Sequence, residues 1–203
     1  MNSGNKLPLH QENPLDVVCL KIASDVSPLF RAMGATPNFI TTLSVIASVL
    51  AIRSIYIGNA KGQFIFWAVL SYFFDCLDGH FARRYDMCTK FGDYYDHISD
   101  WIYFIGIFYT AFVVRGLKPE MKRYKTLIYG LLISVGLVTM IHMGLQEVLY
   151  QNDENTESPT LSIFTGIANK VCKSPEECIR ATRWIGVGTF IAVMIGVVAM
   201  TVR

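Results

Sequence analysis

The sequence predicts an all-α fold: a polytopic membrane helix bundle of five to six transmembrane helices, preceded by an amphipathic interfacial helix. Of its 203 residues, 52% are hydrophobic and 17% are charged, which is more apolar than an ordinary soluble domain. Several apolar stretches reach the roughly 20 residues that a helix needs to cross a bilayer core. The net charge of +2 and the lack of a long Lys/Arg run exclude a nucleic-acid partner. The lipid bilayer is the expected solvent.

Residues 1–35 are predicted to lie outside the spanning bundle. Residues 1–14 are polar and contain no apolar run followed by a small-residue cleavage site, so they do not form a secretory signal. Between Leu15 and Met33, apolar residues recur at steps of three and four, which predicts one apolar stripe on a helix. This helix is too polar to span, and we expect it to lie in the membrane interface with a break at Pro28.

Residues 36–203 are predicted to form one transmembrane domain. Thr36 and Pro37 are typical of a helix N-cap and a first helical residue. Spanning helices are expected at residues 38–57, 64–84, 91–114, 126–144 and 184–202. The second predicted span has an apolar start and a polar end, and the third has the reverse.

Residues 151–180 are predicted to form a polar loop, in which Leu161 to Val171 could form an interfacial or re-entrant helix. Cys172 and Cys178 lie six positions apart in this loop. They could pair if the loop faces an oxidising lumen, or remain two free thiols.

Acidic residues cluster where the second and third predicted spans meet. Asp75 and Asp78 share one face of the second span, and Asp96 and Asp100 share one face of the third. A short connection joins the two helices, so an antiparallel hairpin would bring the four carboxylates around one cavity. Because ionisable residues inside a membrane are costly, they mark a functional site by default.

Four carboxylates at close quarters require cations, since both burial and like charges disfavour the ionised form. Oxygen ligands suit hard ions such as Mg²⁺ or Mn²⁺, and this number of carboxylates suits two ions about 3.5–4 Å apart. Such ions share their remaining positions with substrate phosphates, so we expect a diphosphate substrate. Gly79, Ala82 and Gly92 would let it approach the helix backbones, and Arg83 offers a planar fork for phosphate. If the aspartates merely solvated helix ends, two matched acidic faces with glycines at the same heights would be unexplained.

The segment of residues 75–100, DCLDGHFARRYDMCTKFGDYYDHISD, resembles the signature of the CDP-alcohol phosphotransferase (CDP-alcohol phosphatidyltransferase) family. That signature is DxxDGxxAR followed, after about eight residues, by GxxxDxxxD, and every fixed position agrees. The segment TPNFIT, with Asn38 and Thr41, and the amphipathic helix before it also resemble the family. The resemblance covers roughly residues 12–150; after Tyr150, a polar stretch replaces part of the expected fifth and sixth helices.

The resemblance implies a metal-dependent, phospholipid-synthesising transferase. A hydroxyl of the acceptor would attack the β-phosphorus of a CDP-linked donor, either CDP-diacylglycerol or a CDP-amino alcohol, and CMP would leave. Two divalent cations, Mg²⁺ or Mn²⁺, would be ligated by Asp75, Asp78, Asp96 and Asp100. The CDP moiety would be bordered by Gly79, Ala82, Arg83 and Gly92, with Asn38 and Thr41 near its phosphates. Asp100 is the expected base for the acceptor proton.

His97 is a second catalytic candidate. Asp93 and His97 lie four apart on the third predicted span, so the carboxylate could orient the imidazole; the alternative is a solvated histidine near a helix end. Asp93 and the pair Asp96–His97 resemble the choline and ethanolamine branch of the family, whereas TKFG resembles the inositol and glycerophosphate branch. The donor and the acceptor therefore stay open. We expect His80 at the surface and His142 at the interface or in the core.

Membrane orientation has two opposing indications. The resemblance places the active site at the cytosolic face, in the endoplasmic reticulum if the source is eukaryotic. A basic loop on the opposite side favours the reverse orientation by the positive-inside rule; it consists of Arg115, Lys118, Lys122, Arg123 and Lys125. A homodimer stays open as well.

Two other functions compete with the transferase. An intramembrane prenyltransferase also binds a diphosphate through Asp-rich helices and Mg²⁺, but it needs two separated acidic motifs, and this chain has one contiguous motif. A divalent-cation transporter would use the carboxylates as a pathway. Donor-dependent release of CMP is expected of the transferase alone.

Overall fold

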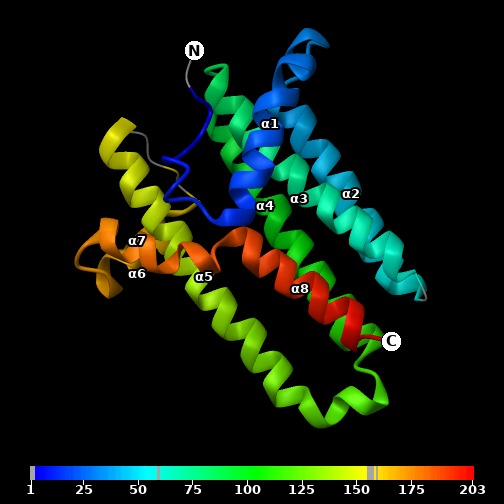
Figure 1. Ribbon diagram of the computed structural model, residues 1–203. Helices are drawn as coiled ribbons and strands as arrows, with labels where there is room; N and C mark the ends of the chain where they lie inside the picture. Colours follow the sequence, from blue (N-terminus) through cyan, green and yellow to red (C-terminus); the bar gives the residue numbers. More distant parts are fainter. Residues whose placement is uncertain (1–2, 59, 155–157, 159) are drawn as a thin grey trace.

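The structure, a computed structural model, describes residues 3–58, 60–154, 158 and 160–203, which form a helical bundle (Figure 1). Its helices are α1 Pro14–Ala32, α2 Pro37–Ile57, α3 Lys61–Arg84, α4 Lys90–Phe108, α5 Lys125–Glu154, α6 Ser162–Val171, α7 Pro175–Thr182 and α8 Val187–Thr201. A π-helical segment, Tyr109–Arg115, extends α4, and 3-10 turns at Pro119–Tyr124 and Arg183–Ile185 precede α5 and α8. The described residues contain no β-strand, which confirms the all-α class.

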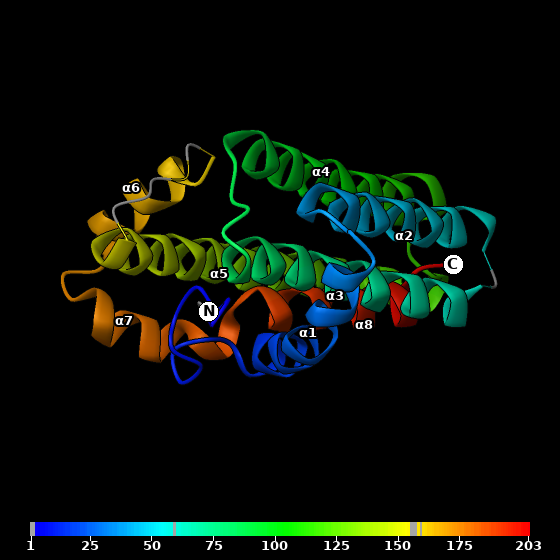
Figure 2. The same ribbon diagram turned by 90° about the horizontal axis from the view of Figure 1, so that it is seen from above.

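Four helical segments are long and apolar enough to cross a membrane: Pro37–Ile57, Lys90–Arg115, Pro119–Tyr150 and Pro175–Thr201. Helix α3 has 24 residues and lies beside α2 in both views (Figures 1 and 2), but its C-terminal half carries charged side chains from Asp75 to Arg84. The helical membrane bundle is confirmed, whereas the count of five to six spans stays a prediction.

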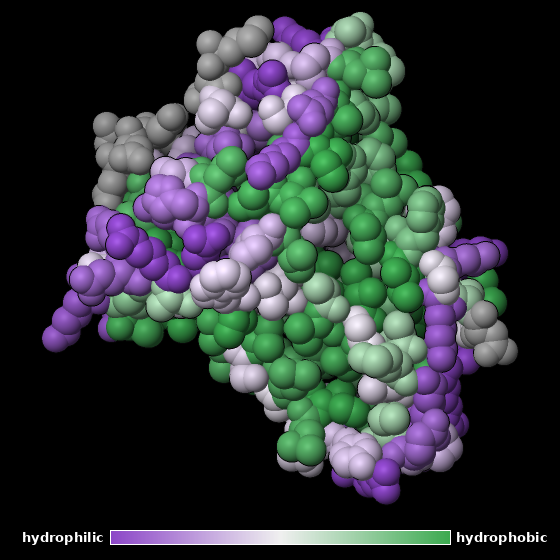
Figure 3. Space-filling view, in the orientation of Figure 1, coloured by the Kyte–Doolittle hydropathy of each residue, from purple (hydrophilic) through white to green (hydrophobic). Residues whose placement is uncertain are grey.

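The bundle has an apolar middle and polar ends. In the view of Figure 2, α2 and α4 form the upper layer of the picture, with α3, α5 and α8 below them. Helix α1 lies on the side of α3 that faces away from α2 and α4. Ala51, Phe64, Ile107 and Met194 contribute to a buried cluster that joins α2, α3, α4 and α8. On the surface, hydrophobic side chains form a broad zone between hydrophilic groups at opposite ends of the molecule (Figure 3).

The N-capping prediction for α2 is confirmed. The Thr36 side chain accepts a hydrogen bond from the backbone N–H of Phe39, at 3.3 Å, and Pro37 is the first helical residue. This N-cap matters for the site because it fixes where the first turn of α2, with Asn38 and Thr41, begins.

The predicted break of α1 at Pro28 is wrong, since α1 continues to Ala32. Proline has no N–H to donate to the carbonyl four residues earlier, which here belongs to Ser24. That carbonyl instead accepts a hydrogen bond from Nη1 of Arg84 at 2.6 Å. The end of α3 therefore supplies the donor that Pro28 lacks, and the helix passes through the proline intact.

The segment before α1 folds back over the end of the bundle that carries the aspartates. The carbonyl of Gly4 accepts a hydrogen bond from Nε of Arg83 at 2.9 Å, and Lys6 forms an ion pair with Glu147 at 2.6 Å. Glu12 is only 3% exposed, and burial raises its pKa to about 7, with the nearby Asp16 adding to the shift. The polar segment before α1 thus connects α3 with α5.

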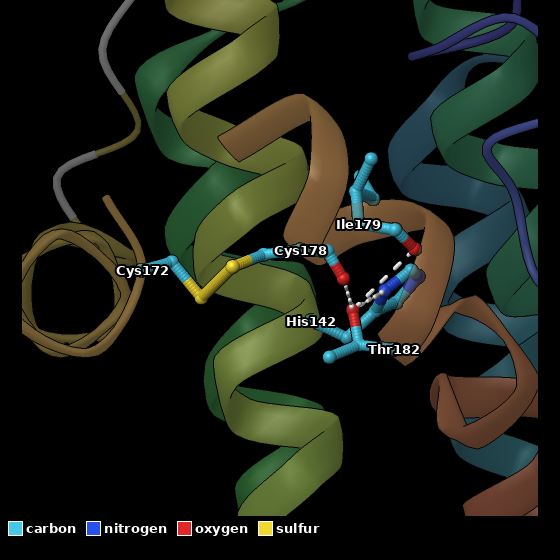
Figure 4. Close-up of a disulfide and its surroundings, with 5 residues drawn as sticks. All are labelled: His142, Cys172, Cys178, Ile179 and Thr182. Carbon is cyan, nitrogen blue, oxygen red and sulfur yellow. Dashed lines mark hydrogen bonds between the residues drawn. A yellow bond between two sulfur atoms is a disulfide. The ribbon is translucent and has the colours of Figure 1, made fainter. Parts of the chain in front are cut away.

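The region predicted as a polar loop contains two short helices as well as the end of α5. Helix α6 covers most of the apolar segment within this region, and α7 is a helix of 8 residues with Pro175 at its start and Glu176 and Glu177 in its first turn. Proline and acidic residues both favour a helix N-terminus, which is why a polar segment can be helical here. Cys172 and Cys178 form a disulfide between α6 and α7 (Figure 4).

His142 was expected at the interface or in the core, and the structure places it in the core. It is fully buried, and its Nδ1 lies 3.0 Å from the hydroxyl of Thr182 beside the disulfide (Figure 4). This contact holds α7 against α5 at the end of the molecule where the aspartates lie.

Candidate metal and nucleotide site

Helix α2 packs against both α3 and α4, and the acidic side chains of α3 and α4 meet beside it. The turn between α3 and α4 ends at Thr89, whose hydroxyl accepts a hydrogen bond from the backbone N–H of Gly92 at 3.0 Å. This N-cap fixes the start of α4 and therefore the height of each acidic residue along it.

Three of the four predicted metal ligands come together. Carboxylate oxygens of Asp75, Asp96 and Asp100 all lie within 4.8 Å of one another, and each residue is partly buried. Asp78 lies outside this group. It is 3% exposed, and one of its carboxylate oxygens accepts a hydrogen bond from the Thr41 hydroxyl at 2.6 Å.

The donor set fits a hard divalent cation. Ionised carboxylates this close repel one another unless a cation lies between them. Mg²⁺ binds oxygen at 2.0–2.1 Å, so ligands on opposite sides of one ion are about 4 Å apart, close to the span of this group. Asp75, Asp96 and Asp100 therefore have the chemistry and nearly the geometry of a metal site.

Two glycines border this site where the structure leaves little room for a side chain. A Cβ built on Gly79 would lie 3.2 Å from Nη1 of Arg83, so the guanidinium lies directly over the glycine. A Cβ on Gly92 would lie 3.2 Å from Oδ1 of Asn38. Ala82, one position before Arg83, is half-buried on the same helix. The predicted nucleotide-contacting residues thus gather at the ends of α2, α3 and α4.

His97 belongs to a network that the sequence did not predict in full. Its Nδ1 lies 2.9 Å from the backbone carbonyl of Asp93 and 2.7 Å from the hydroxyl of Thr160. A carbonyl can only accept, so Nδ1 carries a proton, and in the neutral imidazole Nε2 keeps its lone pair. The Thr160 and Ser158 hydroxyls donate to the two carboxylate oxygens of Asp93, at 2.9 and 2.6 Å.

Sequence reasoning missed Ser158 and Thr160. They lie more than 60 residues from their partners, in a polar segment without periodicity, and a serine or threonine there carries no signal of its own. They could be found only once the chain after α5 was seen to return to the start of α4.

The expectation that His80 lies at the surface is wrong. The residue is fully buried, and a Cβ on Gly4 would approach its ring to 2.7 Å. The cause is the N-terminal segment, which covers this face of α3 and removes the histidine from solvent. Among the described residues, neither ring nitrogen has a hydrogen-bond partner.

Comparison with known proteins agrees with the geometry. The sequence model of the family described as CDP-alcohol phosphatidyltransferase matches residues 34–202, so the match continues past Tyr150 through α8. No curated protein and no solved structure matches the chain. Members of this family transfer a phosphoalcohol group from a CDP-alcohol and use a divalent metal. Since the match covers most of the chain and includes the acidic signature, the chain belongs to the CDP-alcohol phosphatidyltransferase family.

Proposed function

We propose that this protein is a metal-dependent, phospholipid-synthesising transferase that moves a phosphoalcohol group from a CDP-linked donor to a hydroxyl acceptor and releases CMP. The observation that carries the proposal is the convergence of Asp75, Asp96 and Asp100, within the family's signature, to within 4.8 Å. Asp78 completes the proposed set of ligands for two divalent cations, Mg²⁺ or Mn²⁺. Bound there, the cations would offset negative charge on the diphosphate and on the departing CMP.

The protein's own residues would mainly position the reactants. Gly79 and Gly92 would let the CDP moiety lie against the helix backbones, and Arg83 would bind a phosphate through its planar guanidinium. Asn38 and Thr41 would lie near the phosphates, with the Thr41 hydroxyl also fixing the carboxylate of Asp78. The half-buried Ala82 would border the nucleotide on α3.

Asp100 is proposed as the base that takes the proton of the acceptor hydroxyl, and His97 as a residue that orients the acceptor. Since Nδ1 of His97 is engaged by Asp93 and Thr160, its Nε2 is the atom that can accept a hydrogen bond from the acceptor. Asp93 would then act through His97 without touching the substrate.

His97→Ala tests this division of roles. If Asp100 is the base, kcat at saturating acceptor should fall less than about tenfold, while KM for the acceptor rises. Thr160→Val should show a weaker version of the same pattern, and combining the two changes should add little, because the residues act as one unit. A loss of about a hundredfold or more in kcat would be typical of a lost general base and would assign that role to His97.

The reaction is tested by purified protein with Mn²⁺ or Mg²⁺ and either CDP-diacylglycerol or CDP-choline, with CMP release measured against a panel of hydroxyl acceptors. Release that depends on metal, donor and acceptor together is expected. No release with any pairing, from protein shown to be folded, would contradict the proposed function. The same assay separates the transferase from a prenyltransferase or a cation transporter, since neither would release CMP.

We propose that the aspartate-bearing end faces the cytosol, where CDP-linked donors are made. Basic residues occur at both ends, because Arg83, Arg84 and Lys90 lie near the aspartates, so the loop after α4 does not alone decide the orientation. The disulfide lies at the aspartate-bearing end and favours the opposite orientation, with that end in an oxidising compartment.

Labelling decides between these orientations. In sealed vesicles with the cytosolic face outward and Cys88 replaced by Ser, Lys90→Cys should react with a membrane-impermeant maleimide. Glu120→Cys, in the turn before α5 at the opposite end, should react only after permeabilisation. The reverse pattern would place the site in the lumen.

A further inference from the structure

A cavity of about 610 Å³ lies between α4, α5, α6 and α8 and reaches the aspartate cluster at Asp100. Its volume falls within the range of small-molecule sites, about 300–1,000 Å³. Most of its wall is apolar, with Phe104, Phe108, Met140 and Phe190 among the lining residues. The described lining contains no Lys or Arg, so a phosphorylated acceptor would find no positively charged side chain there.

The polar groups of the cavity gather at one end. His97, Asp100 and Thr160 lie at the level of the aspartate cluster, whereas the lining of α4 continues through apolar side chains to Val113. Val113 lies sixteen positions after His97, about 24 Å at the rise of an α-helix. One leaflet of a bilayer core is about 15 Å thick, so the cavity is long enough for a fatty-acyl chain.

The far part of the cavity is open towards the lipid. Ile105, Tyr109 and Val113 line it at successive turns of α4 and its π-helical extension, and they are 65%, 58% and 68% exposed. In the membrane these side chains meet hydrocarbon, so an apolar molecule could reach the cavity sideways from the bilayer.

The cavity lies on the acceptor's side of the proposed reaction. None of the proposed nucleotide residues, Asn38, Gly79, Ala82, Arg83 and Gly92, lines it, whereas the proposed base and His97 do. In phosphoryl transfer, the attacking and leaving oxygens lie roughly in line on opposite sides of phosphorus. With CMP held at the ends of α2, α3 and α4, the attacking hydroxyl comes from the side on which the cavity begins.

We propose that this cavity holds the hydrocarbon chains of the acceptor, so that the acceptor is a membrane-soluble alcohol of the diacylglycerol type and the donor is a water-soluble CDP-amino alcohol. The inference rests on the proposed function. The acceptor oxygen forms a bond to the β-phosphorus, the bond from that phosphorus to the bridging oxygen breaks, and CMP leaves with its electron pair. The proton of the hydroxyl passes to Asp100.

The cavity acts by orientation more than by affinity. An acyl chain that enters it leaves lipid rather than water, so little hydrophobic free energy is gained. What the cavity provides is a fixed chain direction that aims the hydroxyl at phosphorus, and this effect on geometry contributes to the rate. Filling the cavity should therefore impair use of a long-chain acceptor without disturbing donor binding.

Gly136→Phe is the test variant, with Gly130→Phe as its matched control. Gly136 lines the cavity, and a Cβ there would lie 3.5 Å from Phe190, an ordinary contact, so the ring can enter the cavity. Gly130 lies on the same helix, is exposed and has no atom within 4 Å of its Cβ position. Both variants make the same change in α5, and only one of them fills the cavity.

With CDP-choline and dioleoylglycerol, Gly136→Phe should lower kcat/KM for the acceptor at least about tenfold, and Gly130→Phe less than about twofold. Labelling by a photoreactive diacylglycerol should fall in parallel, while Mn²⁺-dependent binding of CDP-choline should stay unchanged in both variants.

Three results would overturn the inference. If wild type uses CDP-diacylglycerol with water-soluble acceptors alone, the proposed function stands and this inference is wrong. Equal labelling of wild type and Gly136→Phe would show that the cavity does not hold the acceptor. A change of oligomeric state in Gly136→Phe with labelling intact would show the same. If no donor releases CMP, the proposed function itself fails.

Discussion

Asp75→Asn, Asp96→Asn and Asp100→Asn are each expected to lower kcat/KM for the acceptor at least about a thousandfold, while the protein still inserts and can be purified. Asparagine keeps the size of the side chain and one oxygen but loses the charge that binds a divalent cation. Losing a single preorganised electrostatic contact typically costs about 10²–10³ in rate, and here the cation itself is weakened. Asp78→Asn should also lose most activity. The measurement is CMP release at saturating donor across a range of Mn²⁺ concentrations.

A second readout separates metal binding from folding. Mn²⁺ should raise the thermal midpoint of wild type, since a ligand that binds the folded state alone stabilises it, and this shift should shrink in the four variants. Without metal, the variants should be as stable as wild type or more stable, because each removes a repelling charge. Asp86→Asn, in the exposed turn before α4, controls for loss of charge alone. Near-normal activity in any two of the four variants would contradict the metal assignment.

Gly79→Leu is expected to weaken binding of the CDP-linked donor at least about a hundredfold. The added side chain would collide with the guanidinium of Arg83, whose Nη1 lies 3.2 Å from the Cβ position, and would fill the space proposed for the nucleotide. Both effects remove donor contacts without touching an aspartate. Donor affinity, measured by equilibrium binding with Mn²⁺ present, is therefore the quantity to follow.

Gly62→Leu is the matched control for Gly79→Leu. It makes the same change on α3, at an exposed position where a Cβ meets no atom within 4 Å. Donor affinity should stay within about twofold of wild type in Gly62→Leu, and stabilisation by Mn²⁺ should persist in both variants. Unchanged donor affinity in Gly79→Leu would show that the nucleotide binds elsewhere.

The acidic cluster was predictable because its information is local. Residues three and four apart share a helix face whatever the rest of the chain does, so Asp75 and Asp78, like Asp96 and Asp100, could be placed on faces from spacing alone. The short connection to Thr89 then limited how the two helices could be arranged. The spacing did not predict that Asp78 lies outside the group of three. Its carboxylate accepts a hydrogen bond from Thr41 of α2.

The sequence by itself determined the membrane bundle, the N-cap of α2, the paired acidic faces and, through its signature, the family. Each of these depends on composition or on neighbours a few residues apart. Tertiary structure decided that α1 passes through Pro28, that His80 is buried, that Ser158 and Thr160 complete the surroundings of His97, and that an apolar cavity begins at Asp100. These features depend on contacts between segments far apart in the chain, such as Arg84 with Ser24 and Thr160 with His97, and no local pattern encodes which distant donor, acceptor or helix face will be nearby.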